Sequence, residues 1–276
     1  MEPAFGSLFP NVHSPLRGKR ILVTAPGTYA ARLLPLLIQR GGRPIYVPVV
    51  EDLPLTDTSH LDRVVATLHE YDWAIFCSRN AIRTTLDRLQ KLRCSIDVFK
   101  GCRTVAIGKD ADALQDAGVT VDMIPKDSSL RGIADEFRQF PSRARVVVFT
   151  PAVVGMPEPN VIPNFVQELV ELGFDVSRTD CYMLATVSHE NERELDFVGR
   201  HGVDIAIFTS SIEIEGLMLA FPRSKDILNQ AIILCFGPKC GETASHFGIP
   251  VHVLPRDTSS FGSLVSALEH YLDVMR

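Results

Sequence analysis

Two stretches of the chain repeat one pattern, and this repeat constrains the fold more than any other feature. Residues 71–82 read YDWAIFCSRNAI and residues 203–212 read VDIAIFTSSI, which places the second copy 132 residues after the first. Each begins as a short apolar run of strand-forming residues and ends in hydroxyl side chains followed by a helix-compatible segment. The pair predicts a structural unit of about half the chain that occurs twice.

Further segments repeat at similar distances. Residues 118–129 (GVTVDMIPKDSS) correspond to residues 248–259 (GIPVHVLPRDTS), and Arg20–Pro26 (RILVTAP) corresponds to Arg145–Pro151 (RVVVFTP). Such nearly constant spacing indicates duplication of a whole unit. On the repeat alone, the chain divides into contiguous halves near residue 140.

Strand and helix patterns alternate along the chain. This alternation predicts an α/β fold with two doubly wound parallel-sheet domains of similar architecture. Ligands of such sheets bind at the carboxyl ends of the strands. Strands are expected at residues 20–26, 43–50, 73–77, 104–107, 119–124, 145–151, 174–185, 203–208, 231–236 and 248–254.

Composition and charge limit the classes of function. Apolar residues make up 46% of the chain and the net charge is −5, so no global attraction to nucleic acid or to an anionic membrane is expected. No apolar run is long enough to span a bilayer, and the first residues lack a signal-peptide pattern. A cytoplasmic location is expected, although a plastid or mitochondrial protein without its transit peptide would look the same. Residues 1–18 are expected to form a loose arm.

Patterns typical of metals and nucleotide cofactors are absent from the sequence. The six cysteines form no C-x-x-C pair, which argues against a zinc site and a disulfide scaffold. The eight histidines have no metal-ligand spacing, and neither glycine-rich nucleotide fingerprint is present. We therefore expect reduced thiols, no metal site and no nucleotide cofactor.

Short hydroxyl and basic side chains gather where the expected strands end. Helices begin nearby, so backbone N–H groups and hydroxyls would favour an anionic ligand. Each Ser or Thr taken alone is also explained as a helix N-cap. The positions are Thr24, Cys77, Ser78, Gly108, Lys109, Thr150, Thr209–Ser211 and Gly237–Cys240.

These features together resemble the uroporphyrinogen-III synthase family from about Lys19 to Tyr271. The resemblance rests on the two AIF-hydroxyl motifs, the turns Ala106–Gly118 and Cys235–Gly248, the P-x-D-x-S loops after them, and Tyr182. It implies that hydroxymethylbilane is closed to uroporphyrinogen III, with inversion of the last pyrrole ring, loss of water and no cofactor. It also implies a place in porphyrin and heme biosynthesis, a monomer, and transient contact with the preceding pathway enzyme.

The resemblance changes the expected domain boundaries. It implies that the first strand and helix belong with the C-terminal half, and that two extended strands, Tyr46–Val50 and Asp180–Leu184, join the domains. One domain is then residues 1–48 with 184–276, and the other is residues 51–180.

The resemblance also implies roles for individual residues. Tyr182 would assist departure of the substrate hydroxyl, whereas without the family an aromatic plug in an interdomain strand explains it equally well. The residues expected to bind substrate carboxylates or pyrrole groups are Thr24, Ser78, Lys109, Thr209, Ser211 and Lys239.

The sequence departs from the family where threonines are usual. The usual G-x-x-T-A turns read GKDAD at residues 108–112 and GPKCG at residues 237–241, so each turn lacks its threonine. Lys109 and Lys239 in these turns would compensate by pairing with carboxylates as point charges. The alternative is a non-catalytic relative that binds a tetrapyrrole or another polyanion. The α/β pattern alone also permits a binder of a small phosphorylated or carboxylated metabolite.

Overall fold

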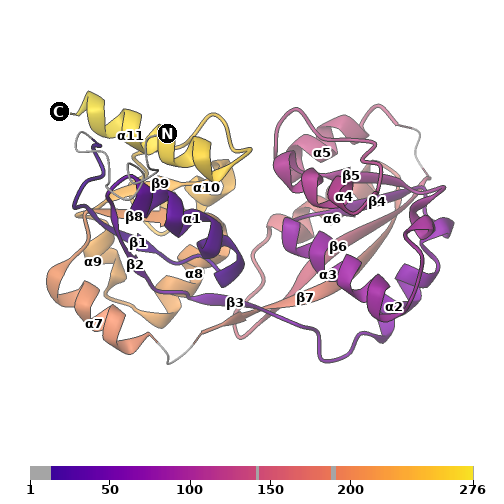
Figure 1. Ribbon diagram of the computed structural model, residues 1–276, viewed down its shortest axis with the longest axis horizontal. Helices are drawn as coiled ribbons and strands as arrows, with labels where there is room; N and C mark the ends of the chain where they lie inside the picture. The colour runs from indigo at the N-terminus through magenta and orange to yellow at the C-terminus, as the bar shows by residue number, and fades with distance from the viewer. Residues whose placement is uncertain (1–13, 141–142, 188–190, 276) are drawn as a thin grey trace, which may run out of the picture. The chain divides into compact units, whose positions relative to one another are not determined.

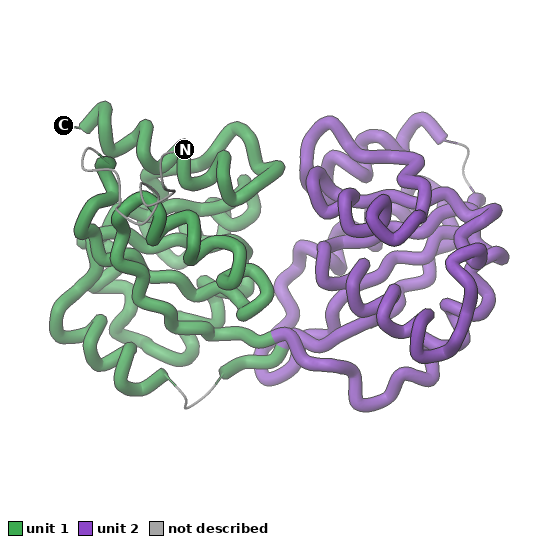
Figure 2. The backbone as a smooth tube through the Cα atoms, in the orientation of Figure 1, with its two compact units in different colours: residues 1–51, 185–276 green, residues 52–184 purple. Residues whose placement is uncertain are grey.

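The computed structural model describes residues 14–140, 143–187 and 191–275. The chain forms two compact units, here called unit 1 (residues 1–51 and 185–276) and unit 2 (residues 52–184), coloured green and purple in Figure 2. It passes from one unit to the other twice, within strand β3 (Val50–Leu53) and within strand β7 (Asp175–Thr186).

Unit 1 contains a four-stranded sheet with the order β2-β1-β8-β9. All three pairings in it are parallel (Figure 1). β1 pairs with β8, which comes some 180 residues later, so the division into contiguous halves is wrong for the first strand. Burial explains this placement, because Ile21, Leu22 and Val23 are at most 2% exposed between β2 and β8. The strands are β1 (Arg20–Val23), β2 (Arg43–Tyr46), β8 (Ile205–Phe208) and β9 (Ile232–Cys235).

Helices cover both faces of this sheet. Successive strand residues point to opposite faces. Ile205 and Ile207 pack in the core with α1 and α11, whereas Ala206 and Phe208 pack with α7 to α10. The arrangement is the doubly wound one that the strand–helix alternation predicts. The helices are α1 (Gly27–Gln39), α7 (Glu192–His201), α8 (Ser211–Ala220), α9 (Ser224–Leu228), α10 (Pro238–His246) and α11 (Phe261–Val274).

Unit 2 contains a five-stranded sheet with the order β3-β7-β6-β4-β5. β4 pairs in parallel with β5 on one side and β6 on the other. Ala74 and Phe76 pack beneath α2, α3 and α4, and Trp73 and Ile75 pack beneath α5 and α6. The strands are β3, β4 (Trp73–Phe76), β5 (Arg103–Ala106), β6 (Arg145–Val154) and β7. The helices are α2 (Ser59–Ala66), α3 (Arg79–Lys91), α4 (Ala111–Asp116), α5 (Leu130–Phe137) and α6 (Val161–Glu171), with 3-10 turns η2 (Leu68–Glu70), η3 (Ile96–Phe99) and η4 (Gly108–Asp110).

Two expected strands are much shorter than predicted. Residues 119–124 and 248–254 each form a single bridge, Met123 to Val105 and Val253 to Leu234. Each lies parallel to the outermost strand of its sheet, β5 or β9, and is followed closely by Pro125 or Pro255. The proline ring limits pairing on the C-terminal side of each bridge, because it restricts the residue before it and has no N–H group. On the N-terminal side, Asp122 Oδ2 accepts from Thr104 N at 2.8 Å and His252 Nδ1 accepts from Ile233 N at 3.1 Å, so side chains occupy the donors that a longer strand would use.

The expected loose arm is partly anchored. Residues 1–13 lie outside the described part of the chain, but Leu16 is fully buried in the core that contains β1 and α11. Ser14 donates from its hydroxyl to Glu269 Oε1 at 3.2 Å. The arm prediction is therefore wrong for residues 14–18, because an apolar side chain near the first strand finds a place in the core.

The repeated P-x-D-x-S loops lead into equivalent helices. Ser129 Oγ accepts from Gly132 N at 3.0 Å at the start of α5, and Ser260 Oγ accepts from Ser263 N at 3.1 Å at the start of α11. Both serines are helix N-caps. No helix in the described ranges combines the length and apolar character that a membrane crossing needs.

Candidate active site

The carboxyl ends of two neighbouring strands in unit 2 bring Ser78 and Lys109 to the same edge of the sheet. β4 ends at Phe76 and leads through Cys77 into Ser78, while β5 ends at Ala106 and leads into the turn η4. The strands are parallel, so their ends meet at the edge where ligands of doubly wound sheets bind.

Tyr182 lies against the start of α3. Its hydroxyl is 3.1 Å from Ser78 Oγ, and its side chain is 5% exposed. Ser78 Oγ also accepts from Ala81 N at 3.1 Å as the N-cap of α3. The N-cap interpretation of Ser78 is thus correct, and it coexists with a contact to Tyr182.

The turn that carries Lys109 contacts the N-terminus of α3 through the Asp110 carboxylate. Asp110 Oδ2 accepts from Arg79 N at 2.9 Å, and Arg79 Nη1 donates to Lys109 O at 3.2 Å. Asp110 therefore accepts a hydrogen bond from one of the backbone N–H groups at the α3 N-terminus that lack a partner within the helix. The Lys109 side chain is exposed. Arg79 was missed in the sequence analysis. A basic residue directly after the motif hydroxyl Ser78 was the signal that could have found it.

A polar network lies beside Tyr182 on β6 and β7. Thr150 Oγ1 donates to Asp180 Oδ1 at 2.8 Å, and Arg178 forms a two-point contact with Glu158 at 2.7 and 2.9 Å. Arg178 Nε also donates to Thr150 Oγ1 at 3.1 Å. Thr150 is fully buried in this network, so its hydroxyl supports the strand ends instead of facing a ligand.

In unit 1, the buried Glu213 carboxylate accepts hydrogen bonds from Thr24 and Thr209, two of the residues expected to bind substrate. Glu213 is fully buried and lies in the first turn of α8. Thr24 Oγ1 donates to Glu213 Oε2 at 3.1 Å, and Thr209 donates from both its N–H and its hydroxyl. Thr24 is itself 0% exposed. The expectation that Thr24 contacts substrate is corrected by this burial, because its hydroxyl holds Glu213 inside the unit.

Burial dominates the protonation of Glu213. It raises the pKa of the carboxyl from 4.5 to about 6, while hydrogen bonds from Thr209, Ser210 and Thr24 oppose the rise. Glu213 is therefore ionised at neutral pH and becomes protonated in mild acid. Sequence reasoning missed this residue, because an acidic side chain three residues into a helix is common on solvated surfaces.

The remaining two predicted residues of unit 1 lie at neighbouring strand ends. Ser211 begins α8 after β8 and is 7% exposed. Lys239 lies in the first turn of α10 after β9, and its Nζ is 2.7 Å from Glu242 Oε2. Both side chains of that pair are more than half exposed, so the pair is weak and leaves Lys239 accessible.

Comparison with known proteins identifies the family. A family model described as uroporphyrinogen-III synthase HemD matches residues 31–266. The chain belongs to the uroporphyrinogen-III synthase family. The resemblance expected from the AIF-hydroxyl motifs and turns is thereby confirmed.

Two curated relatives carry names from the same family. A porphyrin biosynthesis protein HemD of Ruminiclostridium josui is 24% identical over 246 residues, covering 88% of this chain and 47% of that protein. A uroporphyrinogen-III synthase of Synechococcus elongatus is 29% identical over 126 residues, covering 45% of this chain and 47% of that protein. The chain thus spans about half the length of the curated relatives it matches.

Solved structures of uroporphyrinogen III synthase from Thermus thermophilus share the fold. A mutant form is 17% identical, with a TM-score of 0.64 over 93% of this chain and all of that one. The wild type is 19% identical, with a TM-score of 0.52 over 94% of this chain and 99% of that one. The predicted fold class, two α/β domains with parallel sheets, is confirmed.

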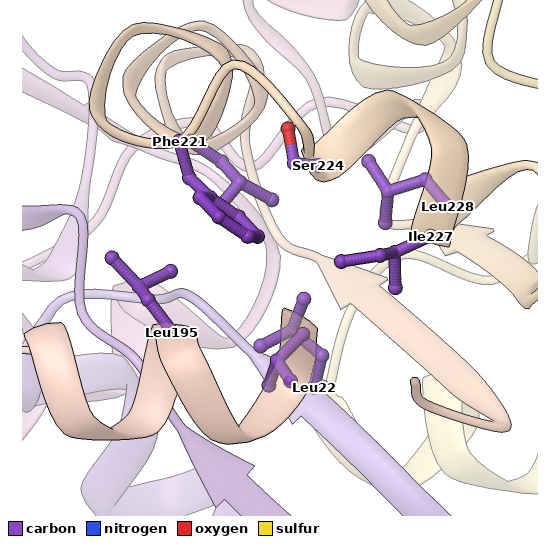
Figure 3. Close-up of a pocket in the computed structure, with 8 residues that line it drawn as sticks. Leu22, Leu195, Phe221, Ser224, Ile227 and Leu228 are labelled. Carbon is purple, nitrogen blue, oxygen red and sulfur yellow. The ribbon is translucent and has the colours of Figure 1, made fainter. Parts of the chain in front are cut away.

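One pocket of unit 1 is lined almost wholly by hydrophobic side chains and does not suit a ligand that carries carboxylates. Its lining residues come from β1, α7, α8 with Phe221 after it, and α9 (Figure 3). A pocket for a chain bearing carboxylates needs donors, but seven of the eight lining residues are hydrophobic and only Ser224 is polar. The pocket is a narrow gap between side chains of the hydrophobic core.

All six cysteines are free, and burial raises the pKa of Cys181 to about 12, so this thiol beside Tyr182 stays protonated. Within the described ranges, no three His, Cys, Asp or Glu side chains are grouped to hold a metal ion.

Proposed function

We propose that this chain closes hydroxymethylbilane to uroporphyrinogen III, as a cyclising hydro-lyase that inverts the last pyrrole ring and releases water. Membership of the uroporphyrinogen-III synthase family supports the reaction class. The observation that carries the proposal is the contact of 3.1 Å between the Tyr182 and Ser78 hydroxyls, at the carboxyl ends of the unit 2 strands.

Tyr182 would assist the departure of the substrate hydroxyl. Phenols ordinarily hold their proton near neutral pH and can donate it to a leaving hydroxide. The carbon–oxygen bond breaks, the oxygen takes the phenol proton, and water departs. Ser78 orients the phenol because its own oxygen is held by Ala81 N. The carbocation left on the substrate would be stabilised by the substrate's own carboxylates, so folding of the bilane is the main contribution of the protein.

Substrate carboxylates would meet exposed lysines and a serine hydroxyl at the strand edges. Lys109, Lys239 and Ser211 are proposed for this role. That the chain works as a cytoplasmic monomer, with transient contact with the preceding pathway enzyme, stays a prediction.

The direct test supplies hydroxymethylbilane made in situ and separates the porphyrin isomers after oxidation. Isomer III is the expected product. Isomer I alone, the product of spontaneous closure, would contradict the proposal.

The second candidate is a relative that binds a tetrapyrrole without converting it. The engagement of both glycine turns favours it, since Asp110 holds the α3 N-terminus and Lys239 pairs with Glu242. Binding of uroporphyrinogen without formation of isomer III would support this candidate over the enzyme.

A further inference from the structure

The Glu213 carboxylate is fully buried yet accepts four hydrogen bonds. Oε1 accepts from the hydroxyls of Thr209 and Ser210, the latter at 3.0 Å. Oε2 accepts from Thr24 Oγ1 and Thr209 N, both at 3.1 Å. A carboxylate has about four acceptor positions, so this set satisfies the ion completely.

An ionised carboxylate sets the direction of each of these bonds. It can only accept, so every hydroxyl that contacts it must turn its own proton toward it. The oxygens of Thr209 and Ser210 then retain lone pairs and no proton for any other partner. Thr209 is 7% exposed and Ser210 is half-buried, whereas Thr24 has no exposed surface.

The equivalent segment of unit 2 has no carboxylate at the position of Glu213. Ala81 stands at the position equivalent to Glu213, and its N–H donates to Ser78 Oγ at 3.1 Å. Ser210, the equivalent of Ser78, makes no such bond to α8. The lone pairs of Ser210 are therefore left available at the end of β8.

We propose that Glu213 is a positioning residue that fixes Thr209 and Ser210 as hydrogen-bond acceptors, so that these two hydroxyls bind pyrrole N–H groups and disfavour carboxylates. The inference rests on the proposed function for its ligand class. A carboxylate here would meet lone pairs and a buried negative charge. Ser211 is not among the donors to Glu213 and keeps its proton for a carboxylate.

Glu213→Gln tests the direction of the bonds while keeping the shape of the side chain. The amide donates through its nitrogen, which forces at least one hydroxyl to turn its proton outward. The probes are a dipyrromethane dicarboxylate and its N,N′-dimethyl analogue, with affinity measured by calorimetry. We expect the wild type to prefer the N–H probe by about tenfold, as one hydrogen bond supplies, and the variant to lose that preference.

Thr24→Val provides a second variant that removes one donor without touching the exposed surface. It is expected to weaken the preference in the same direction. Thr104→Val is the matched control in unit 2, because Thr104 is 1% exposed and its hydroxyl donates to Thr120 O, away from any carboxylate. This control is expected to keep the full preference.

A pH series separates positioning from a purely structural role. The Cys240 thiol on α10 is a titratable neighbour of Glu213. Contact with Cys235 and burial raise the pKa of this thiol well above 9.0, so it stays neutral. The wild-type preference should fall as Glu213 gains a proton near pH 6, and Glu213→Gln should show no such change.

The two proposals fail in distinguishable ways. A wild type that yields only isomer I contradicts the proposed function. A wild type without preference for the N–H probe, or a Glu213→Gln variant that retains it, overturns the inference about Glu213.

Discussion

The Tyr182 hydroxyl lies 3.1 Å from Ser78 Oγ, which links β7 to the first turn of α3 in unit 2. Ser78 Oγ already accepts from Ala81 N, so its position is set by the helix and not by a ligand. The phenol of Tyr182 is held in turn, although the two residues are 104 positions apart. A proton donor held in this way loses little freedom when substrate binds.

Replacing Tyr182 by phenylalanine should reduce kcat by about a hundredfold or more, as loss of a proton donor does. The free energy of unfolding should fall by only about 1 kcal/mol, because a single hydrogen bond is lost. Stopped assays of isomer III formation and urea titrations measure the two quantities.

Tyr71→Phe is the control for this change. Tyr71 is also buried in unit 2, at 9% exposure, but it precedes β4 instead of following the strand ends. Its loss of a hydroxyl should leave kcat unchanged. Normal turnover by the Tyr182 variant would remove this residue from the mechanism.

Ser78→Ala should lower both stability and turnover. The variant loses an N-cap, which costs about 1 kcal/mol, and it also frees Tyr182. Ser129→Ala is matched to it, since Ser129 caps α5 in the same unit by the same contact to the third helical residue. Equal losses of activity in the two variants would show that Ser78 acts only as a cap.

Glu213 should make the stability of unit 1 depend on pH. Burial raises its pKa from 4.5 to about 6, so the folded state binds the proton more tightly than the unfolded chain does. The resulting stabilisation, about 2 kcal/mol, is complete below pH 4.5 and is lost as pH rises through 6. Glu213→Gln removes this dependence.

The measurement is the difference in unfolding free energy between Glu213→Gln and the wild type, taken from pH 4 to pH 7. Subtraction cancels the other titrating groups. Between pH 4 and pH 7 the wild type should lose about 2 kcal/mol of stability relative to Glu213→Gln. The exposed Glu194→Gln on α7 controls for loss of a surface carboxylate and should give a difference close to zero. A flat curve for Glu213→Gln would contradict the expected titration.

Gly132→Ala should destabilise unit 2 by more than about 2 kcal/mol, as overpacking against backbone does. A methyl group at this position would lie 2.1 Å from the Asp127 carbonyl oxygen in the P-x-D-x-S loop. Gly262→Ala is the matched change in the first turn of α11, where the nearest atom is 3.6 Å away. It should be neutral or stabilise by up to about 1 kcal/mol through helix propensity. Thermal unfolding of both variants decides between these expectations.

Much of the architecture is predictable because it depends on local patterns. The apolar runs ending at Phe76 and Phe208 form interior strands in both units, and a helix begins after each of them. Ser78 caps α3 as expected, whereas Ser210 precedes α8 without capping it. The shortened strands at residues 119–124 and 248–254 were not predictable, because they depend on an edge position and on contacts of the Asp122 and His252 side chains with the neighbouring strand.

The sequence by itself determined the repeat, the α/β class and the hydroxyl-bearing strand ends, since periodicity and turn chemistry act over a few residues. Only the tertiary structure decided what those hydroxyls contact. Thr24 and Glu213 are 189 positions apart, and the pairing of β1 with β8 brings them within hydrogen-bond distance. The direction of each hydroxyl proton follows from that long-range contact, because a buried carboxylate must be satisfied by whichever donors the fold places around it.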